Sequence, residues 1–151
     1  MLVRDRVARI GPTLLAALLL SIASCASVPS GVRVWVEAPL EVDLGDEFTI
    51  SAVVENSSSS EVELVDLDIA DSYLRGIAIV STNPRFYELM HVPLDNTMSY
   101  TFNQPVAPGG TLRVALRAVA EDSGTFQGDF DFCIDSMLAC VYYTVTTIVR
   151  P

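Results

Sequence analysis

Lysine is absent from the sequence and histidine occurs once, at His91, and both shortages limit the chemistry open to the chain. A serine or cysteine nucleophile needs a base beside it, and His91 is the one imidazole in the sequence. No Gly-x-Ser-x-Gly segment occurs. Zinc and copper sites usually combine several histidines and cysteines, which the chain lacks. We therefore expect no enzyme activity and no cofactor, and keep a hydrolase based on His91 or paired carboxylates as a third hypothesis.

Positive charge is also scarce. The nine Lys+Arg residues are all arginine and face 19 Asp+Glu, for a net charge of −10. Three arginines and one acid precede residue 25, so the rest of the chain has six arginines and 18 acidic residues, a net charge of −12. Affinity for nucleic acid comes mostly from cations that neutralise phosphates, so we expect no nucleic-acid partner. Charge of one sign also favours solubility.

Long apolar runs are limited to one, of about a dozen residues between Ile10 and Ile22, which is too short to span a bilayer comfortably. It follows Arg4, Arg6 and Arg9 and ends in small residues. This layout is typical of a secretory signal peptide.

The end of this run, Ile22-Ala23-Ser24-Cys25, resembles the lipobox of bacterial lipoproteins. The resemblance implies that Cys25 is lipidated and becomes the mature N-terminus, on the extracytoplasmic side of the bacterial cell envelope. The absence of Asp after Cys25 implies the outer membrane if the cell has one. A plain signal peptide is the alternative. We expect a signal peptide over residues 1–24, a lipidated cysteine and linker over 25–31, and one domain over 32–151, with the membrane as partner through the lipid.

Two cysteines remain, Cys133 and Cys140. In an extracytoplasmic compartment, an even number of cysteines left after lipidation predicts a disulfide. A metal site is the competing interpretation, but it needs further histidines or cysteines.

Beyond residue 31 there is no helical periodicity of useful length, and apolar residues recur at every second position. About eight such segments, separated by turn residues, predict an all-β chain folded as an antiparallel β-sandwich of about seven or eight strands. The alternation changes phase by one residue between Leu64 and Val65, which predicts a β-bulge. Residues 83–90 are the exception, because Asn83 and Pro84 predict the start of a short helix over one end of the sandwich.

The last two predicted strands can be aligned on their cysteines. If Cys133 lies opposite Cys140 in an antiparallel pair, the apolar sets of both strands fall on one face, and the cysteines fall on the other, polar face. The resulting pairs are Phe132–Val141, Phe130–Tyr143, Gly128–Val145, Asp131–Tyr142 and Asp129–Thr144. A slip of one residue would destroy this agreement. The sequence therefore predicts a terminal hairpin whose disulfide lies on its polar face.

Two segments resemble bacterial immunoglobulin-like domains, including the cell-adhesion-related type. One runs from Pro39 to Asn56 through the turn Gly45-Asp46-Glu47-Phe48, and the other is Ala107-Pro108-Gly109-Gly110-Thr111 before a long alternating strand. The cohesin-type sandwich opens similarly. Either resemblance implies an immunoglobulin-like fold used for display or binding, although a fold alone does not assign a function.

Three groups of side chains are candidate binding residues. Trp35 and Tyr142 would form an aromatic platform for envelope glycan, and Phe86 and Tyr87 would contact an envelope protein. Carboxylates suit Ca²⁺, and the candidates are Asp66, Asp68, Asp129 and Asp131. A solvated strand face is the alternative for the aspartates. We expect a lipid-anchored, non-catalytic interaction or structural module, with a calcium- or glycan-binding domain as the alternative.

Overall fold

The computed structural model describes residues 27–151, so the expected signal peptide and Cys25 lie outside the described residues. Within this range the chain forms ten strands and one short helix. In chain order they are β1 (Val32–Glu37), β2 (Glu41–Asp43), β3 (Glu47–Asn56), β4 (Val62–Ala70), α1 (Asp71–Leu74), β5 (Ile77–Asn83), β6 (Glu88–Val92), β7 (Thr97–Val106), β8 (Thr111–Ala120), β9 (Gly124–Ile134) and β10 (Cys140–Arg150).

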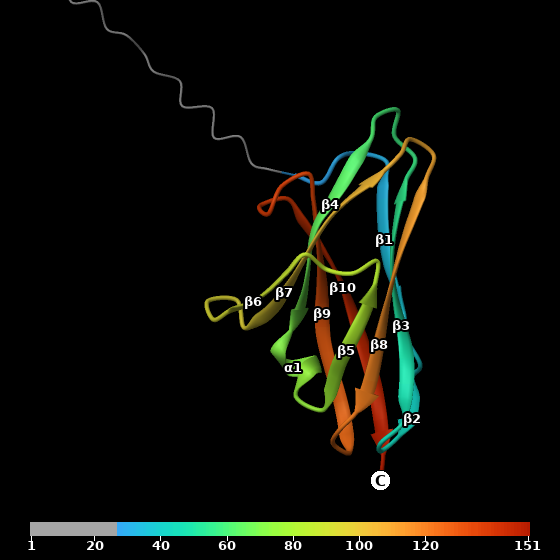
Figure 1. Cartoon of the computed structure of the whole chain (residues 1–151), viewed down its shortest axis with the longest axis vertical. Helices are drawn as coiled ribbons and strands as arrows, with labels where there is room; N and C mark the ends of the chain where they lie inside the picture. The colour runs from blue at the N-terminus through green and yellow to red at the C-terminus, as the bar shows by residue number, and fades with distance from the viewer. Residues whose placement is uncertain (1–26) are drawn as a thin grey trace, which may run out of the picture.

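The strands form two sheets that pack against each other (Figure 1). One has four strands in the order β1-β3-β8-β5, and the other has six in the order β2-β10-β9-β4-β7-β6. Neighbouring strands are antiparallel except β2 and β10, which are parallel. The predicted immunoglobulin-like sandwich is confirmed, and the strands beyond the eight predicted are the short β2 and β6.

The core lies between the sheets and is built from alternate residues of the long strands. Ile50 and Leu116 come from the four-stranded sheet, and Leu67, Phe130 and Phe132 from the six-stranded one, and all five are fully buried. This arrangement follows from the period of two, which turns every second side chain of a strand inward. Burial of these apolar surfaces, at roughly 25 cal/mol per Å², is the main force that holds the two sheets together.

Two local predictions are confirmed in detail. The register of β4 shifts between Leu64 and Asp66 against both of its neighbours, which is the predicted bulge. The pairing of β9 with β10 is the predicted register, with Cys133 opposite Cys140, and these cysteines form a disulfide. Cys133 is buried although its strand face was expected to be open, because β4 lies beside it with Asp66 opposite.

The helix predicted for residues 83–90 is wrong. These residues contain the end of β5 and the start of β6, and β6 pairs with β7 so that Leu89 lies opposite Tyr100. A helix of eight residues is marginal in water. The ten-residue β7 offers a full row of backbone partners, and this tertiary pairing outweighs the local capping signal.

A short helix that the sequence did not predict, α1, closes one end of the core. Its Tyr73 is fully buried, packs edge-on against Phe130 with ring centroids 5.2 Å apart, and shares a 2.9 Å hydrogen bond with the hydroxyl of Thr147. Burial raises the pKa of Tyr73 to about 12. Gly128 makes this contact possible, because a Cβ there would lie 2.9 Å from the Cβ atoms of Ala70 and Tyr73.

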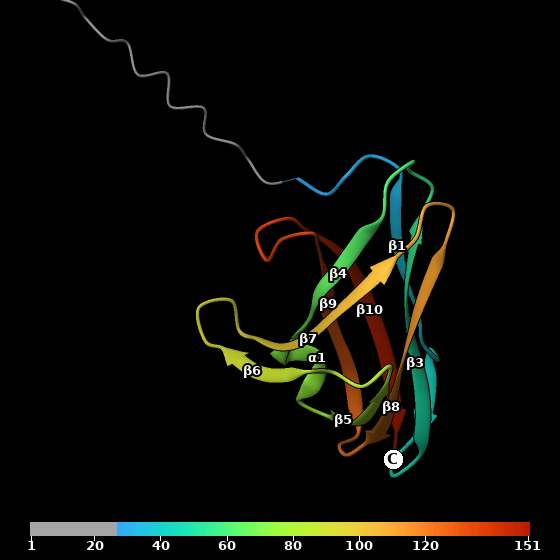
Figure 2. The same cartoon turned by 45° about the horizontal axis from the view of Figure 1, so that its top comes forward.

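The described chain starts at one end of the sandwich and Pro151 lies at the other (Figures 1 and 2). Among residues 27–151 no helix has the length and apolar character needed to cross a membrane.

Candidate functional site

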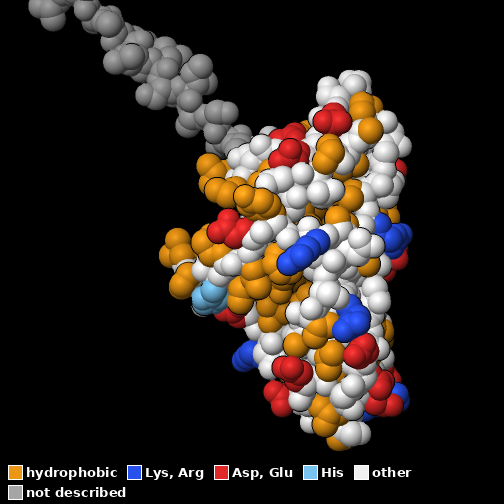
Figure 3. Space-filling model, in the orientation of Figure 1, with side chains coloured by type: hydrophobic (Ala, Val, Ile, Leu, Met, Phe, Trp, Pro, Cys, Tyr) orange, Lys and Arg blue, Asp and Glu red, His pale blue; other side chains and the backbone are white. Residues whose placement is uncertain are grey.

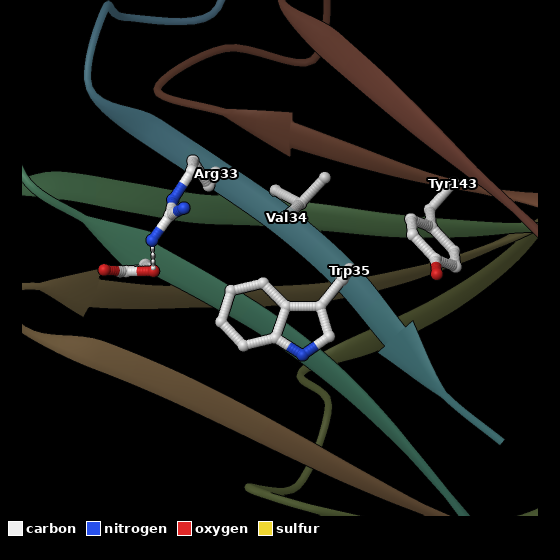
Figure 4. Close-up of a pocket in the computed structure, with 5 residues that line it drawn as sticks. Arg33, Val34, Trp35 and Tyr143 are labelled. Atoms are coloured by element: carbon white, nitrogen blue, oxygen red, sulfur yellow. Dashed lines mark hydrogen bonds and ion pairs between the residues drawn. The ribbon is translucent and has the colours of Figure 1, made fainter.

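A cleft of about 500 Å³ opens between β1, the edge strand of the four-stranded sheet, and β10 of the other sheet (Figure 4). It is lined by Arg33, Val34, Trp35, Glu55 and Tyr143. β1 supplies three of these residues because it is the edge strand of its sheet, and no further strand lies beyond it to cover β10. The cleft therefore combines two aromatic side chains with one ion pair.

Charged groups hold the side chains of this cleft in place. The indole Nε1 of Trp35 donates a 3.0 Å hydrogen bond to Glu37 Oε1, and Arg113 Nη1 donates a 2.6 Å bond to the other carboxylate oxygen. These two donors, Arg113 first, lower the pKa of the Glu37 carboxyl. Arg33 Nη2 donates to Glu55 Oε2 at 2.7 Å on the neighbouring rim. Trp35 lies opposite Val53, which is fully buried although it belongs to the outer face.

The arrangement is suited to binding a ligand. Aromatic rings supply flat apolar area, and the carboxylates and guanidinium groups beside them accept and donate hydrogen bonds. Sugar rings present the same combination, an apolar face with hydroxyls around its rim. This cleft is thus the strongest candidate binding site among the described residues.

The predicted pairing of Trp35 with Tyr142 is wrong. Tyr142 lies opposite Asp131 on the outer face of the six-stranded sheet, and the aromatic residue beside Trp35 is its neighbour Tyr143. Strand parity predicted that Tyr143 faces the core with Phe130, and it does lie on that side of β10. Its side chain is nevertheless 39% exposed, since the other sheet ends at β1 before covering it. Sequence parity gives the side of a sheet but not the extent of the opposite sheet.

Phe86 and Tyr87 also have different surroundings. Phe86 packs against the core and contacts the ring of Tyr100 edge-on at 5.5 Å, whereas Tyr87 is 82% exposed. A second hollow, of about 320 Å³, lies beside Phe86 and is lined by Val80, Ser81, Thr82, Arg85 and Phe86. Of the two aromatic residues predicted to contact an envelope protein, Tyr87 is therefore the exposed one.

The four candidate aspartates do lie on one face, the outer face of the six-stranded sheet. Asp68 is directly opposite Asp131, and Asp66 is opposite Cys133. Hydroxyl groups bind two of the carboxylates: Thr101 donates to Asp66 at 2.6 Å and Thr144 donates to Asp129 at 2.6 Å. Within residues 27–151 no set of three or more His, Cys, Asp or Glu side chains is arranged to hold a metal ion.

Two of these aspartates have altered acidity. Burial raises the pKa of Asp68; a hydrogen bond from the Ser99 hydroxyl lowers it in part, and the nearby carboxylates of Asp66 and Asp95 raise it further. Burial, and then the carboxylates of Asp68, Asp129 and Asp95, raise the pKa of Asp131. One oxygen of Asp68, Oδ1, is buried and has no hydrogen-bond partner. The main physical cause is burial of these carboxylates, and like charges on adjacent strands add to it.

His91 contacts a carboxylate and not a nucleophile. Its Nε2 lies 2.8 Å from Asp71 Oδ2, so the pair connects β6 to the start of α1. Both side chains are partly exposed. This contact gives His91 a structural interaction beside the β6–β7 turn.

Comparison with known proteins identifies the fold class. The structure is similar to the solution structure of the CARDB domain of a Pyrococcus furiosus protein, with a TM-score of 0.51, 11% identity and coverage of 80% of this chain and 94% of that one. It is also similar to AvmM, which catalyses macrocyclization in alchivemycin A biosynthesis, with a TM-score of 0.50, 7% identity and coverage of 82% and 90%. The cupredoxin domain of amoB from Nitrosocaldus yellowstonii has a TM-score of 0.49, 10% identity and coverage of 82% and 89%.

No protein-family model and no curated protein matches the chain. The structural similarities show the fold alone, at these identities. The chain is an immunoglobulin-like β-sandwich domain, a class that includes modules such as CARDB.

Proposed function

We propose that the chain is a membrane-anchored extracytoplasmic lipoprotein, and that its immunoglobulin-like domain is a non-catalytic interaction or structural module of the bacterial cell envelope. The observation that carries the proposal is the position of the lipobox-like residues 22–25 directly before the folded domain. Val28, three residues after Cys25, already packs against the core. Three residues span at most about 11 Å, so a lipid on Cys25 would hold the domain close to the bilayer.

The disulfide supports an extracytoplasmic compartment, because the cytosol keeps most thiols reduced. Cys133 and Cys140 form it with each other, which leaves Cys25 as the third cysteine of the sequence. Two or more acyl chains on one cysteine provide a durable anchor.

The proposal is tested by labelling bacteria that express the chain with radioactive palmitate. The native chain should carry label and float with membranes, whereas Cys25→Ala should do neither. The double variant Cys133→Ala/Cys140→Ala is the matched control and should keep the label. Equal labelling of the native chain and Cys25→Ala would refute the lipoprotein assignment.

The cleft at Trp35 supports a second candidate function, the binding of envelope glycan. The observation in its favour is the pair Trp35 and Tyr143 beside the Arg33–Glu55 ion pair. The native chain should co-sediment with peptidoglycan, and Trp35→Ala should weaken this binding about tenfold or more, as expected when a central aromatic contact of an interface is removed. Tyr142→Ala removes an exposed aromatic residue from the other sheet and serves as control. Equal co-sedimentation of both variants would exclude the cleft.

A further inference from the structure

Four segments of the chain meet at the end of the sandwich where the described chain starts. They are residues 27–31 before β1, 57–61 between β3 and β4, 107–110 between β7 and β8, and 135–139 between β9 and β10. Backbone hydrogen bonds connect the first three: Ser57 donates to Gly31 at 2.8 Å, and Gly109 donates to the carbonyl of Asn56 at 2.7 Å. The fourth is bonded to β4, where Asp135 donates to Glu63 at 2.9 Å. In Figures 1 and 2 the β9–β10 loop lies at this end, beside the start of the described chain.

The β9–β10 loop presents two large apolar side chains to solvent. Met137 is 69% exposed and Leu138 is 82% exposed, although the flanking Ala139 is buried. Figure 3 shows hydrophobic side chains at the surface in the region of this loop. Two neighbouring exposed apolar side chains on one loop are available for contact with an apolar partner.

The loop is held firmly in this shape. The disulfide closes its base, and Ile134 donates a 2.9 Å backbone bond to the carbonyl of Ala139. Asp135 is bound twice to Glu63, once through its own backbone N–H at 2.9 Å and once through its carboxylate at 2.7 Å. Since the loop is already ordered, contact with a partner would cost little conformational entropy.

This end of the domain also carries little charge. Across the four segments the charged residues are Glu61 and Asp135, while the domain as a whole has a net charge of −12. A charged residue is expensive to bring to the apolar boundary of a bilayer, whereas serine, glycine and proline are tolerated at its polar surface. The anchored end is therefore the part of the surface best suited to rest on lipid.

We propose that Met137 and Leu138 insert into the interface of the bilayer that holds the lipid on Cys25. The inference rests on the proposed lipoprotein function, because the linker that starts at Cys25 enters the fold at the end where this loop lies. The lipid limits the domain to the membrane surface, and the two side chains orient it, so that the β2–β3 turn and Pro151 point away from the membrane. The disulfide then acts as the support of a membrane-contacting loop.

The test uses the full lipidated chain in phosphatidylcholine vesicles whose acyl chains carry bromine, which quenches nearby tryptophan. Trp35 is the single tryptophan, so Trp35→Phe provides a background without emission. Leu138→Trp and Met137→Trp are the two reporters. Leu44→Trp is the matched control, since Leu44 is also exposed (49%) but lies in the β2–β3 turn, whose backbone binds Arg150 near the other end.

We expect the emission of Leu138→Trp and Met137→Trp to shift to the blue and lose intensity in brominated vesicles, and that of Leu44→Trp to stay unchanged. Mass analysis of the N-terminal peptide and flotation of the vesicles report separately on the lipid anchor. A chain that is lipidated and floats, but whose loop reporters are not quenched, overturns this inference and leaves the proposed function intact. Equal quenching of all three reporters also overturns it, and a chain without lipid overturns both proposals.

Discussion

The outer faces of the two sheets both carry polar side chains at every second position of their strands. They differ in how far the acidic side chains are paired with arginines. On the four-stranded sheet each arginine forms an ion pair with a glutamate from another strand of the same sheet. The pairs are Arg33–Glu55 at 2.7 Å, Arg113–Glu37 at 2.6 Å and Arg117–Glu47 at 3.7 Å. Cross-strand pairs of opposite charge stabilise a sheet slightly, and these pairs are exposed, so each contributes little.

The six-stranded sheet pairs Arg150 with Glu41 and Asp43 at its β2 edge. Its strands β4 and β9 differ, because they carry Asp66, Asp68, Asp129 and Asp131 on the outer face. Among residues 27–151 none of the four takes part in an ion pair, and hydroxyl groups of Thr101 and Thr144 bind two of them instead. The pKa values of Asp68 and Asp131 are raised by burial first and then by the neighbouring carboxylates, which no cation offsets. Alternation of apolar and polar residues along a strand makes the outer face polar. The signs of the charges on neighbouring strands then decide whether that face stabilises or destabilises the fold.

The largest effect should come from the covalent support of the acidic face. Cys133→Ala/Cys140→Ala removes a cross-link that closes a loop of eight residues, and the chain-entropy model gives a loss of about 2.5 kcal/mol in the free energy of unfolding. Chemical denaturation of the variant, and of the native chain after reduction, measures it. A loss of stability in the variant with unchanged far-ultraviolet circular dichroism is expected. Unchanged stability in both samples would contradict the role of the disulfide.

A gain in stability is expected from Asp68→Asn, because the variant removes one of two like charges placed directly opposite each other. Such pairs cost about 0.2–1 kcal/mol. The pKa of Asp68 is raised in the folded state, so its stability contribution is fully present below the unfolded pKa and is lost as the pH rises through the folded pKa. The gain should therefore be largest at pH 7 and disappear near pH 3.

Asp129→Asn is the control for this prediction, because Asp129 keeps a hydroxyl donor from Thr144. Its effect at pH 7 should be smaller than that of Asp68→Asn. If Asp68→Asn stabilises the chain equally at pH 3 and pH 7, charge crowding is not the cause.

The smallest effect, and of opposite sign, is expected from Glu37→Gln on the other face. The pKa of Glu37 is lowered by Arg113 and Trp35, so its contribution is present above the unfolded pKa and is lost as the pH falls through the folded pKa. The variant should be slightly less stable than the native chain at pH 7, and salt should reduce the difference because the pair is exposed. If Glu37→Gln instead stabilised the chain, the charges on the outer face of the four-stranded sheet would not be stabilising, and the two faces would not differ as described.

The terminal hairpin shows how far the sequence predicts this fold. Its register, the disulfide between Cys133 and Cys140, and the bulge after Leu64 all follow from the period of two, because a one-residue slip exchanges the faces of a whole strand. The acidic face was predictable for the same reason, since Asp129 and Asp131 have the parity opposite to Phe130.

The candidate binding cleft was only half predictable. Trp35 was identified from its parity, but its neighbour Tyr143 was assigned to the core and Tyr142 was chosen instead. The error has a physical reason: a strand's alternation records which side each residue faces, not whether another sheet covers that side. Residues 83–90 failed for a related reason, because β7 provides backbone partners that a local capping signal does not register.

By itself the sequence determined the fold class, the faces of the strands and the pairing of its last two cysteines, because side-chain alternation and cross-strand register are local properties of an extended chain. Tertiary structure alone decided that β1 stops short of Tyr143, that like charges on β4 and β9 lie opposite each other, and that Met137 and Leu138 share an end of the molecule with the chain's entry point. These features depend on which strands become neighbours, and that choice is made by the packing of the whole core.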